Sequence, residues 1–145
     1  MFYNCTNLTQ APELPATTLA PNCYQYMFYG CTSLTQAPDL PATTLAGNCY
    51  QYMFEGCTSL TTAPALPATT LAYRCYEYMF KGCTKIKLST TQTDEYQTPY
   101  RIPTTGIGTT ANKALTSMFT DTGGTFTGTP EINTTYYLHT SNTVV

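Results

Sequence analysis

Apolar residues recur along this chain at a fixed distance of 26 residues, and the polar residues between them recur with them. The clearest instances are the Met-Phe pairs that begin at Met27, Met53 and Met79. A period of this length indicates structural repeats that stack, so that like residues lie over like and bury one another. The pattern predicts architecture more directly than it predicts chemistry.

Differences between the repeats separate the positions that we expect in solvent from those that we expect in the core. The positions that vary are polar or turn-forming, and they include Glu13, Asp39 and Ala65, then Asn22, Asn48 and Arg74, then Tyr29, Glu55 and Lys81. The apolar positions that hardly vary include Leu8, Leu34 and Leu60, then Leu14, Leu40 and Leu66, then Leu19, Leu45 and Leu71. Stacking at roughly 5 Å, the spacing of strands, would bury these as continuous rows.

Within one repeat, the residue types predict a short strand and then one or two short helical segments. Residues 34–37 read as extended and end at Pro38, which lacks the N–H group that a strand ladder needs. Residues 41–45 begin with a proline, which is tolerated at the first position of a turn or helix. The repeat therefore alternates between an extended and a helical part.

A second helical segment is predicted over residues 48–54. Asn48, with Gln51 three residues later, resembles a capping box, in which each side chain satisfies a backbone N–H group of the first helical turn. Gly56 then supplies the left-handed residue on which helices commonly end.

The signature Met-Phe-x-Gly-Cys, followed three positions later by an apolar residue, resembles the BspA-like class of bacterial leucine-rich repeats. It is carried by Met27, Phe28, Gly30, Cys31 and Leu34, by Met53, Phe54, Gly56, Cys57 and Leu60, and by Met79, Phe80, Gly82, Cys83 and Ile86. The resemblance covers residues 1 to about 88 and implies units of a strand and a helical turn. We therefore expect an α/β solenoid of 26-residue leucine-rich repeats over residues 1–83.

The pattern changes over residues 84–145, where we expect an atypical, β-containing C-terminal cap. Alternation near residues 85–88 and apolar residues near 96–102 predict a hairpin-type insertion over residues 84–109. Residues 114–119 then echo the Met-Phe segment of the repeats and predict a degenerate last repeat, with a helix over 111–119. Terminal repeats are expected to be atypical because they must cover an otherwise open core.

Composition excludes some partners. Charged residues make up 10% of the chain and the net charge is −2, so nucleic acid and anionic membrane surfaces are not expected partners. No apolar run approaches the roughly 20 residues of a membrane-spanning helix. Because the chain opens in the middle of a repeat, we expect further repeats upstream.

Seven cysteines invite three interpretations. A metal site is disfavoured, because close-pair spacing is missing and His139 is the single histidine. Disulfides such as Cys23 with Cys31 or Cys49 with Cys57 are disfavoured if the intervening segment is helical, because the Cα atoms would then lie about 9 to 12 Å apart. Buried thiols that pack as small apolar groups are the preferred interpretation.

Tyrosines form two columns that lie two residues apart and so on different sides of a helical turn. The columns are Tyr24, Tyr50 and Tyr76, and Tyr26, Tyr52 and Tyr78. One column is expected in the core and the other on an outer face. We take Tyr24, Tyr50 and Tyr76 as candidate ligand-facing residues, with packing between neighbouring repeats as the alternative.

No set of acid, base and nucleophile assembles from the sequence, so we expect neither an enzyme nor a cofactor. The carboxylates are scattered or, as in Asp94 and Glu95, adjacent in a turn. The resemblance implies a non-catalytic interaction or adhesion module of a larger bacterial cell-surface or secreted protein. Its partners would be surface proteins or glycans. The alternative is a structural or receptor-binding part of a phage tail, located on a virion.

Overall fold

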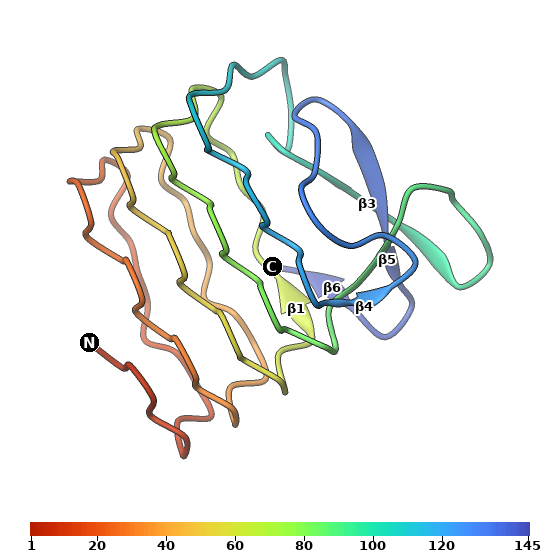
Figure 1. The fold of residues 1–145 in the computed structure, drawn as a ribbon, viewed down its shortest axis with the longest axis horizontal. Coiled ribbons are helices and arrows are strands. Elements are labelled where there is room, and N and C mark those ends of the chain that lie inside the picture. Colours follow the sequence, from red (N-terminus) through yellow and green to blue (C-terminus); the bar gives the residue numbers. More distant parts are fainter.

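Each 26-residue repeat forms one turn of the chain, and successive turns lie side by side (Figure 1). The computed structural model describes residues 1–145. Backbone hydrogen bonds join the turns at a fixed offset: the N–H of Phe28 donates to the carbonyl of Met53 at 2.9 Å, and the N–H of Phe54 to that of Met79 at 2.9 Å. The period of the sequence is therefore the period of the contacts.

The regular secondary structure consists of six short strands. They are β1 (Thr62–Ala63), β2 (Lys87–Ser89), β3 (Tyr96–Arg101), β4 (Gly123–Gly124), β5 (Thr135–His139) and β6 (Thr143–Val144). The structure contains no helix, and hence none that could cross a membrane.

The predicted α/β solenoid of leucine-rich repeats, with a helix in each repeat, is therefore wrong. Residues 41–45, 48–54 and 111–119, for which we expected helices, form turns, bridges and irregular segments instead. The chain is strand-rich and free of helix, and its two sheets are open.

Backbone conformation explains why the predicted helices do not form. In the segment expected to be helical, Asn48, Tyr52 and Gly56 all have positive φ, at 59°, 59° and 77°. One left-handed residue in every four interrupts any right-handed helix. The expected capping box is also absent, because the N–H of Asn48 donates to the carbonyl of Tyr73 in the next turn.

Backbone N–H groups in the segment 48–56 donate alternately to the next turn and within their own turn. The N–H of Tyr50 reaches the next turn, where it donates to the carbonyl of Cys75 at 3.0 Å. The N–H of Gln51 closes a local turn instead, by donating to the carbonyl of Asn48 at 3.3 Å. Every N–H group along the segment is thus used, in two alternating directions.

The core consists of rows of identical residues from successive turns. Four phenylalanine rings, those of Phe28, Phe54, Phe80 and Phe119, stack with centroids 5.4–5.6 Å apart. All four are at most 1% exposed. Phe119 comes from residues 84–145, so the row continues past the regular repeats.

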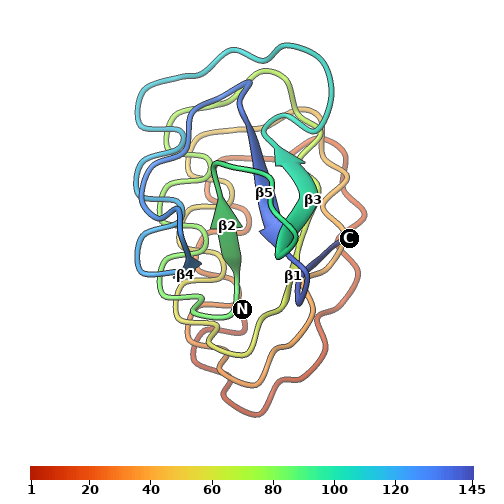
Figure 2. The ribbon, with the colours of Figure 1, turned by 90° about the vertical axis from the view of Figure 1, so that its right-hand side faces the viewer.

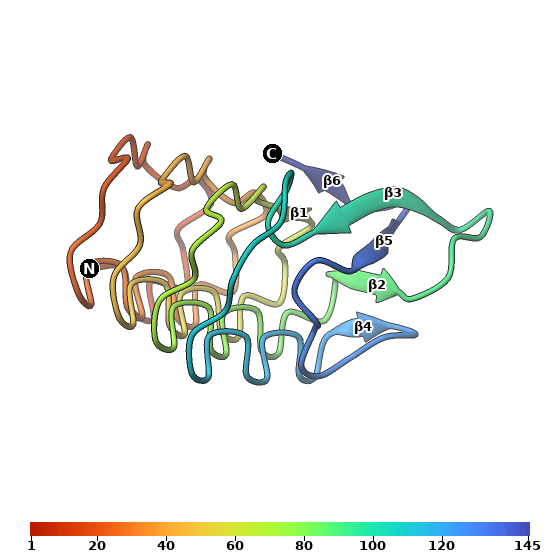
Figure 3. The same cartoon turned by 90° about the horizontal axis from the view of Figure 1, so that it is seen from above.

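Four strands at the C-terminal end form a sheet in the order β3-β5-β2-β4 (Figures 2 and 3). The strands β2 and β3 are both present near the predicted positions, but they do not form the expected hairpin, because β5 lies between them and is antiparallel to both. Leu88 of β2 and Leu138 of β5 are opposite each other and fully buried.

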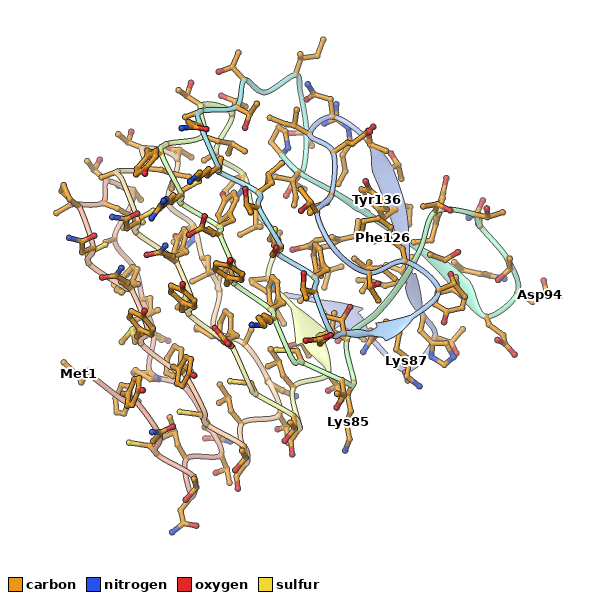
Figure 4. The ribbon with its side chains drawn as sticks, in the orientation of Figure 1. Met1, Lys85, Lys87, Asp94, Phe126 and Tyr136 are labelled. Atoms are coloured by element: carbon orange, nitrogen blue, oxygen red, sulfur yellow. The ribbon has the colours of Figure 1, made fainter.

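Beside this sheet, Phe126 packs against Tyr136 of β5, with ring centroids 4.5 Å apart (Figure 4). Asp94 lies at the tip of the loop between β2 and β3, away from the stacked turns (Figure 4). The last strand, β6, pairs in parallel with β1 of the third repeat. The end of the chain thereby lies against the regular repeats.

Candidate functional site

The tyrosine column that we proposed as ligand-facing lies mostly in the core. Tyr50 and Tyr76 are each 1% exposed, and Tyr24 is half-buried at the end of the row. Their rings stack 5.8 Å apart. Burial raises the pKa of all three phenols. Tyr50 and Tyr76 therefore pack inside the stack, and only Tyr24 of this column keeps part of its surface accessible.

The other tyrosine column reaches the surface and, together with two neighbours, makes the most distinctive surface of the molecule. We call it the tyrosine face, and its members are Tyr3, Tyr26, Tyr29, Tyr52 and Tyr78. Tyr3 is 54% exposed and the others are partly exposed. Aromatic side chains in a partly exposed cluster are typical of interaction surfaces.

Local backbone geometry turns this column outward. Tyr26, Tyr52 and Tyr78 have φ values of 59°, 59° and 56°. Residues two positions away, such as Tyr50 and Phe54, point into the core. Tyr24, Tyr50 and Tyr76 are not left-handed, so the two tyrosine columns differ in backbone conformation although they are only two positions apart.

The rings of the tyrosine face are packed against one another rather than left open. Tyr26 and Tyr52 stack with centroids 4.6 Å apart, and Tyr52 and Tyr78 with centroids 4.9 Å apart. Tyr3 stacks on Tyr29 at 4.8 Å. Stacking thus covers both faces of the Tyr52 ring and one face of each of the other four rings.

None of the five hydroxyl groups of the tyrosine face has a hydrogen-bond partner within the protein. By contrast, the buried hydroxyl of Tyr100 donates to the carbonyl of Pro64 at 2.7 Å, and that of Tyr136 accepts from the N–H of Glu131 at 2.8 Å. The surface hydroxyl groups are therefore available both as donors and as acceptors.

One ion pair borders the tyrosine face. Lys81 Nζ lies 3.8 Å from Glu55 Oε1 and 5.4 Å from the ring centroid of Tyr78. The Glu55 carboxylate is the main reason that the pKa of Tyr29 is raised. The tyrosine face therefore presents its hydroxyl groups beside one acidic and one basic side chain.

Sequence reasoning identified both tyrosine columns but could not say which one faces outward. The signal lay in the position three residues after the Tyr26 column, where Tyr29 is replaced by Glu55 and Lys81 in the next two repeats. That variable column is partly exposed, and its first member, Tyr29, contacts Tyr26 of the outward-facing column.

The seven cysteines are free thiols. Cys57 Sγ donates to the carbonyl of Phe28 at 3.1 Å, and Cys83 Sγ to that of Phe54 at 3.0 Å, so this column contributes sulfur hydrogen bonds between turns. Burial raises the pKa of Cys57 and of Cys75 to about 12. Neither thiol ionises at neutral pH, which makes both poor nucleophiles.

A buried polar row runs beside the tyrosine columns. Gln25 Nε2 donates to Gln51 Oε1, and Gln51 Nε2 donates to Glu77 Oε1, each at 2.6 Å. The second carboxylate oxygen of Glu77 lies 3.7 Å from Arg74 Nε. The row has the same 26-residue step as the core, and its Gln25, Gln51 and Glu77 side chains are joined by hydrogen bonds, which assigns it to structure rather than to chemistry.

No three His, Cys, Asp or Glu side chains are grouped so that they could hold a metal ion. Comparison with known proteins gives no match: no protein-family model, no curated protein and no solved structure is significantly similar to this chain.

Proposed function

We propose that this chain is a non-catalytic recognition module that binds its partner through the tyrosine face, in an adhesive role at a bacterial surface. The observation that carries the proposal is the set of five clustered tyrosines whose hydroxyl groups have no partner within the protein. Tyrosine gives a large contact area with little conformational entropy to lose, which favours its use in binding surfaces.

The geometry of the stack favours a protein over a glycan as the partner. A sugar ring binds an aromatic residue by laying its C–H groups on the ring face. In the stack of Tyr26, Tyr52 and Tyr78 those faces are turned to one another at 4.6–4.9 Å. What the stack offers instead is a row of ring edges and hydroxyl groups, which suits the polar and apolar mixture of a protein surface.

The ring spacing also bears on the kind of protein surface. Hydroxyl groups that follow rings 4.6–4.9 Å apart have nearly the spacing of neighbouring β-strands, about 4.7–4.9 Å. A sheet whose strands run across the stack would present one side chain to each tyrosine. The bacterial surface location is supported by the resemblance of the Met-Phe-x-Gly-Cys signature to BspA-like proteins, which are typically surface antigens or adhesins.

The proposal is tested by screening the protein against arrays of host and bacterial surface proteins and of glycans, together with two variants. The triple variant Tyr26→Phe, Tyr52→Phe, Tyr78→Phe keeps the ring stack and removes only the hydroxyl groups. The variant Tyr52→Lys places a charge in the middle of the face. We expect a protein ligand whose affinity falls at least about tenfold, or 1.4 kcal/mol, in both variants.

Thr44→Lys is the matched control, because Thr44 is exposed in the same repeat but lies outside the tyrosine face. It adds the same charge and should leave the affinity unchanged. Circular dichroism and urea unfolding confirm that all variants fold. Binding that is equal in the wild type and in both tyrosine variants would remove the tyrosine face from the function.

A further inference from the structure

The last turn of the stack, residues 112–121, repeats the backbone geometry of the turns before it. In the preceding turn, the N–H of Arg74 donates to the carbonyl of Asn112 at 3.2 Å, and the N–H of Tyr76 to that of Ala114 at 2.9 Å. Lys113 has positive φ, at 57°, like Arg74 at 53°. The backbone N–H groups at the corresponding positions of residues 112–121 therefore point away from the stack, where no further turn supplies carbonyl acceptors.

Residues 128–129 accept hydrogen bonds from only some of these N–H groups. The N–H of Ser117 donates to Thr129 Oγ1 at 2.9 Å, and the N–H of Phe119 to the carbonyl of Gly128 at 2.9 Å. The N–H groups of Lys113 and Leu115, which occupy the positions of Arg74 and Tyr76, have no hydrogen-bond partner within the protein. Two adjacent positions of the ladder are thus left open.

An open hollow of about 440 Å³ lies at these two positions. Its lining combines the end of the ladder with the segment that covers the neighbouring donors, and includes Lys113, Leu115, Thr129, Pro130, Glu131 and Ile132. The volume is within the range of small ligand sites. Open donors and a hollow therefore occur at the same place, although each is observed independently.

We propose that this hollow binds a short, uncharged, extended peptide segment of a partner protein, whose backbone carbonyls accept from the N–H groups of Lys113 and Leu115. Two donors that are two residues apart match two carbonyls on one edge of an extended chain. This is the pairing that every earlier turn makes with the turn after it, and addition of a strand to an open edge is a common mode of peptide binding.

The charges at the hollow favour a neutral peptide over an anion. Its ionisable lining groups are one lysine and one glutamate, Lys113 and Glu131, so the site carries no net charge. An anion would meet the carboxylate of Glu131 as well as the two amides. The apolar lining, which includes Leu115, Pro130 and Ile132, suits the side chain of an uncharged residue between the two carbonyls.

Amide NMR of the full chain with a library of uncharged seven-residue peptides tests the proposal, with acetate as the anionic probe. We expect the free Lys113 and Leu115 amides to exchange with solvent faster than those of Arg74 and Tyr76. A bound peptide should shift the Lys113 and Leu115 signals and slow their exchange at least about tenfold. Acetate should leave them unchanged.

Asn112→Trp supplies the blocking variant, because Asn112 is exposed and lines the hollow. It should weaken peptide binding at least about tenfold, while Thr43→Trp, which adds the same ring at an exposed position outside the hollow, should not. The proposal is overturned if no peptide shifts the two amides, if acetate shifts them as strongly, or if Asn112→Trp binds as the wild type does. The tyrosine face is not involved, so Tyr52→Lys should bind these peptides normally, which separates the two proposals.

Discussion

Replacing Phe54 by alanine should be among the most destabilising single changes in this protein. The ring is fully buried and stacks on Phe28 and Phe80, with centroids 5.6 and 5.5 Å away. Removal of a buried phenylalanine typically costs about 3–5 kcal/mol. With two aromatic neighbours, each pair worth about 0.5–1.5 kcal/mol beyond the buried area, the upper part of that range, about 4–5 kcal/mol, is expected.

Phe2 supplies the internal comparison, because it is the same residue in the same row at the end of the stack. It is partly exposed and stacks on one ring only, that of Phe28 at 5.6 Å. Because Phe2 is partly exposed, alanine there loses only about half the transfer free energy of a buried phenylalanine, together with one aromatic pair. The expected cost of Phe2→Ala is therefore about 1.5–2 kcal/mol. The two alanine variants should therefore differ by at least about 2 kcal/mol.

Equilibrium urea unfolding followed by circular dichroism measures both costs. Domains of this kind have a free energy of unfolding of about 5–15 kcal/mol, so the unfolding of Phe54→Ala should still be measurable, with its midpoint at a much lower urea concentration. If Phe54→Ala costs less than about 2 kcal/mol, or no more than Phe2→Ala, then the phenylalanine row is not the continuous core described above.

Three further changes test other parts of the structure by the same unfolding measurement. Gly56→Ala should lower the free energy of unfolding by about 1–2 kcal/mol, because φ is +77° at Gly56. Gly47→Ala should be close to neutral, because φ is not positive at Gly47. Equal losses in the two variants would contradict the left-handed conformation of Gly56. Burial raises the pKa of Cys57 from its ordinary value near 9 to about 12. The free energy of unfolding should therefore hold below pH 9 and fall as the pH rises from 9 to 12, because the thiol ionises first in the unfolded chain. A Cys57→Ala variant should show a smaller fall over this pH range, and an identical fall would refute the burial of Cys57. Glu77→Ala should cost about 1–3 kcal/mol more than Glu77→Gln, because only alanine leaves the buried Gln51 Nε2 without an acceptor, and equal losses would show that this hydrogen bond is not needed.

The contacts of the core could be read from the sequence because they depend only on the period. Residues 26 apart are identical or similar, and burial of like against like places Phe28, Phe54 and Phe80 in one row. No knowledge of the backbone between them is needed for that inference. The same reasoning applies to Phe119, whose segment echoes the Met-Phe signature.

The backbone of the repeat could not be read in the same way. Asn48 and Gln51 have the spacing of a capping box, but Gln51 Nε2 donates to Glu77 of the next turn, and the N–H of Asn48 donates to Tyr73. Local spacing favoured a helix, while contacts between turns satisfied the same groups in another conformation. Positive φ at Tyr52, a residue that rarely adopts it, has no signal in a single sequence.

The candidate site was only partly predictable for the same reason. Both tyrosine columns were visible, but the choice between them depends on the left-handed conformation of Tyr52, which Tyr50 does not share. In the C-terminal part, β2 and β3 lie near their predicted positions, but β5 separates them. Strand order is set by the packing of segments far apart in the sequence, such as Leu88 against Leu138. These residues do not follow the 26-residue period, so the period cannot predict their contact.

The most direct test of the account is an NMR measurement of couplings across backbone hydrogen bonds, because both the outward tyrosines and the open donors depend on the ladder between turns. We expect a coupling between the amide nitrogen of Phe28 and the carbonyl carbon of Met53, and another between Phe54 and Met79. A coupling from Phe54 to the carbonyl of Tyr50, four residues earlier as in an α-helix, would contradict the account.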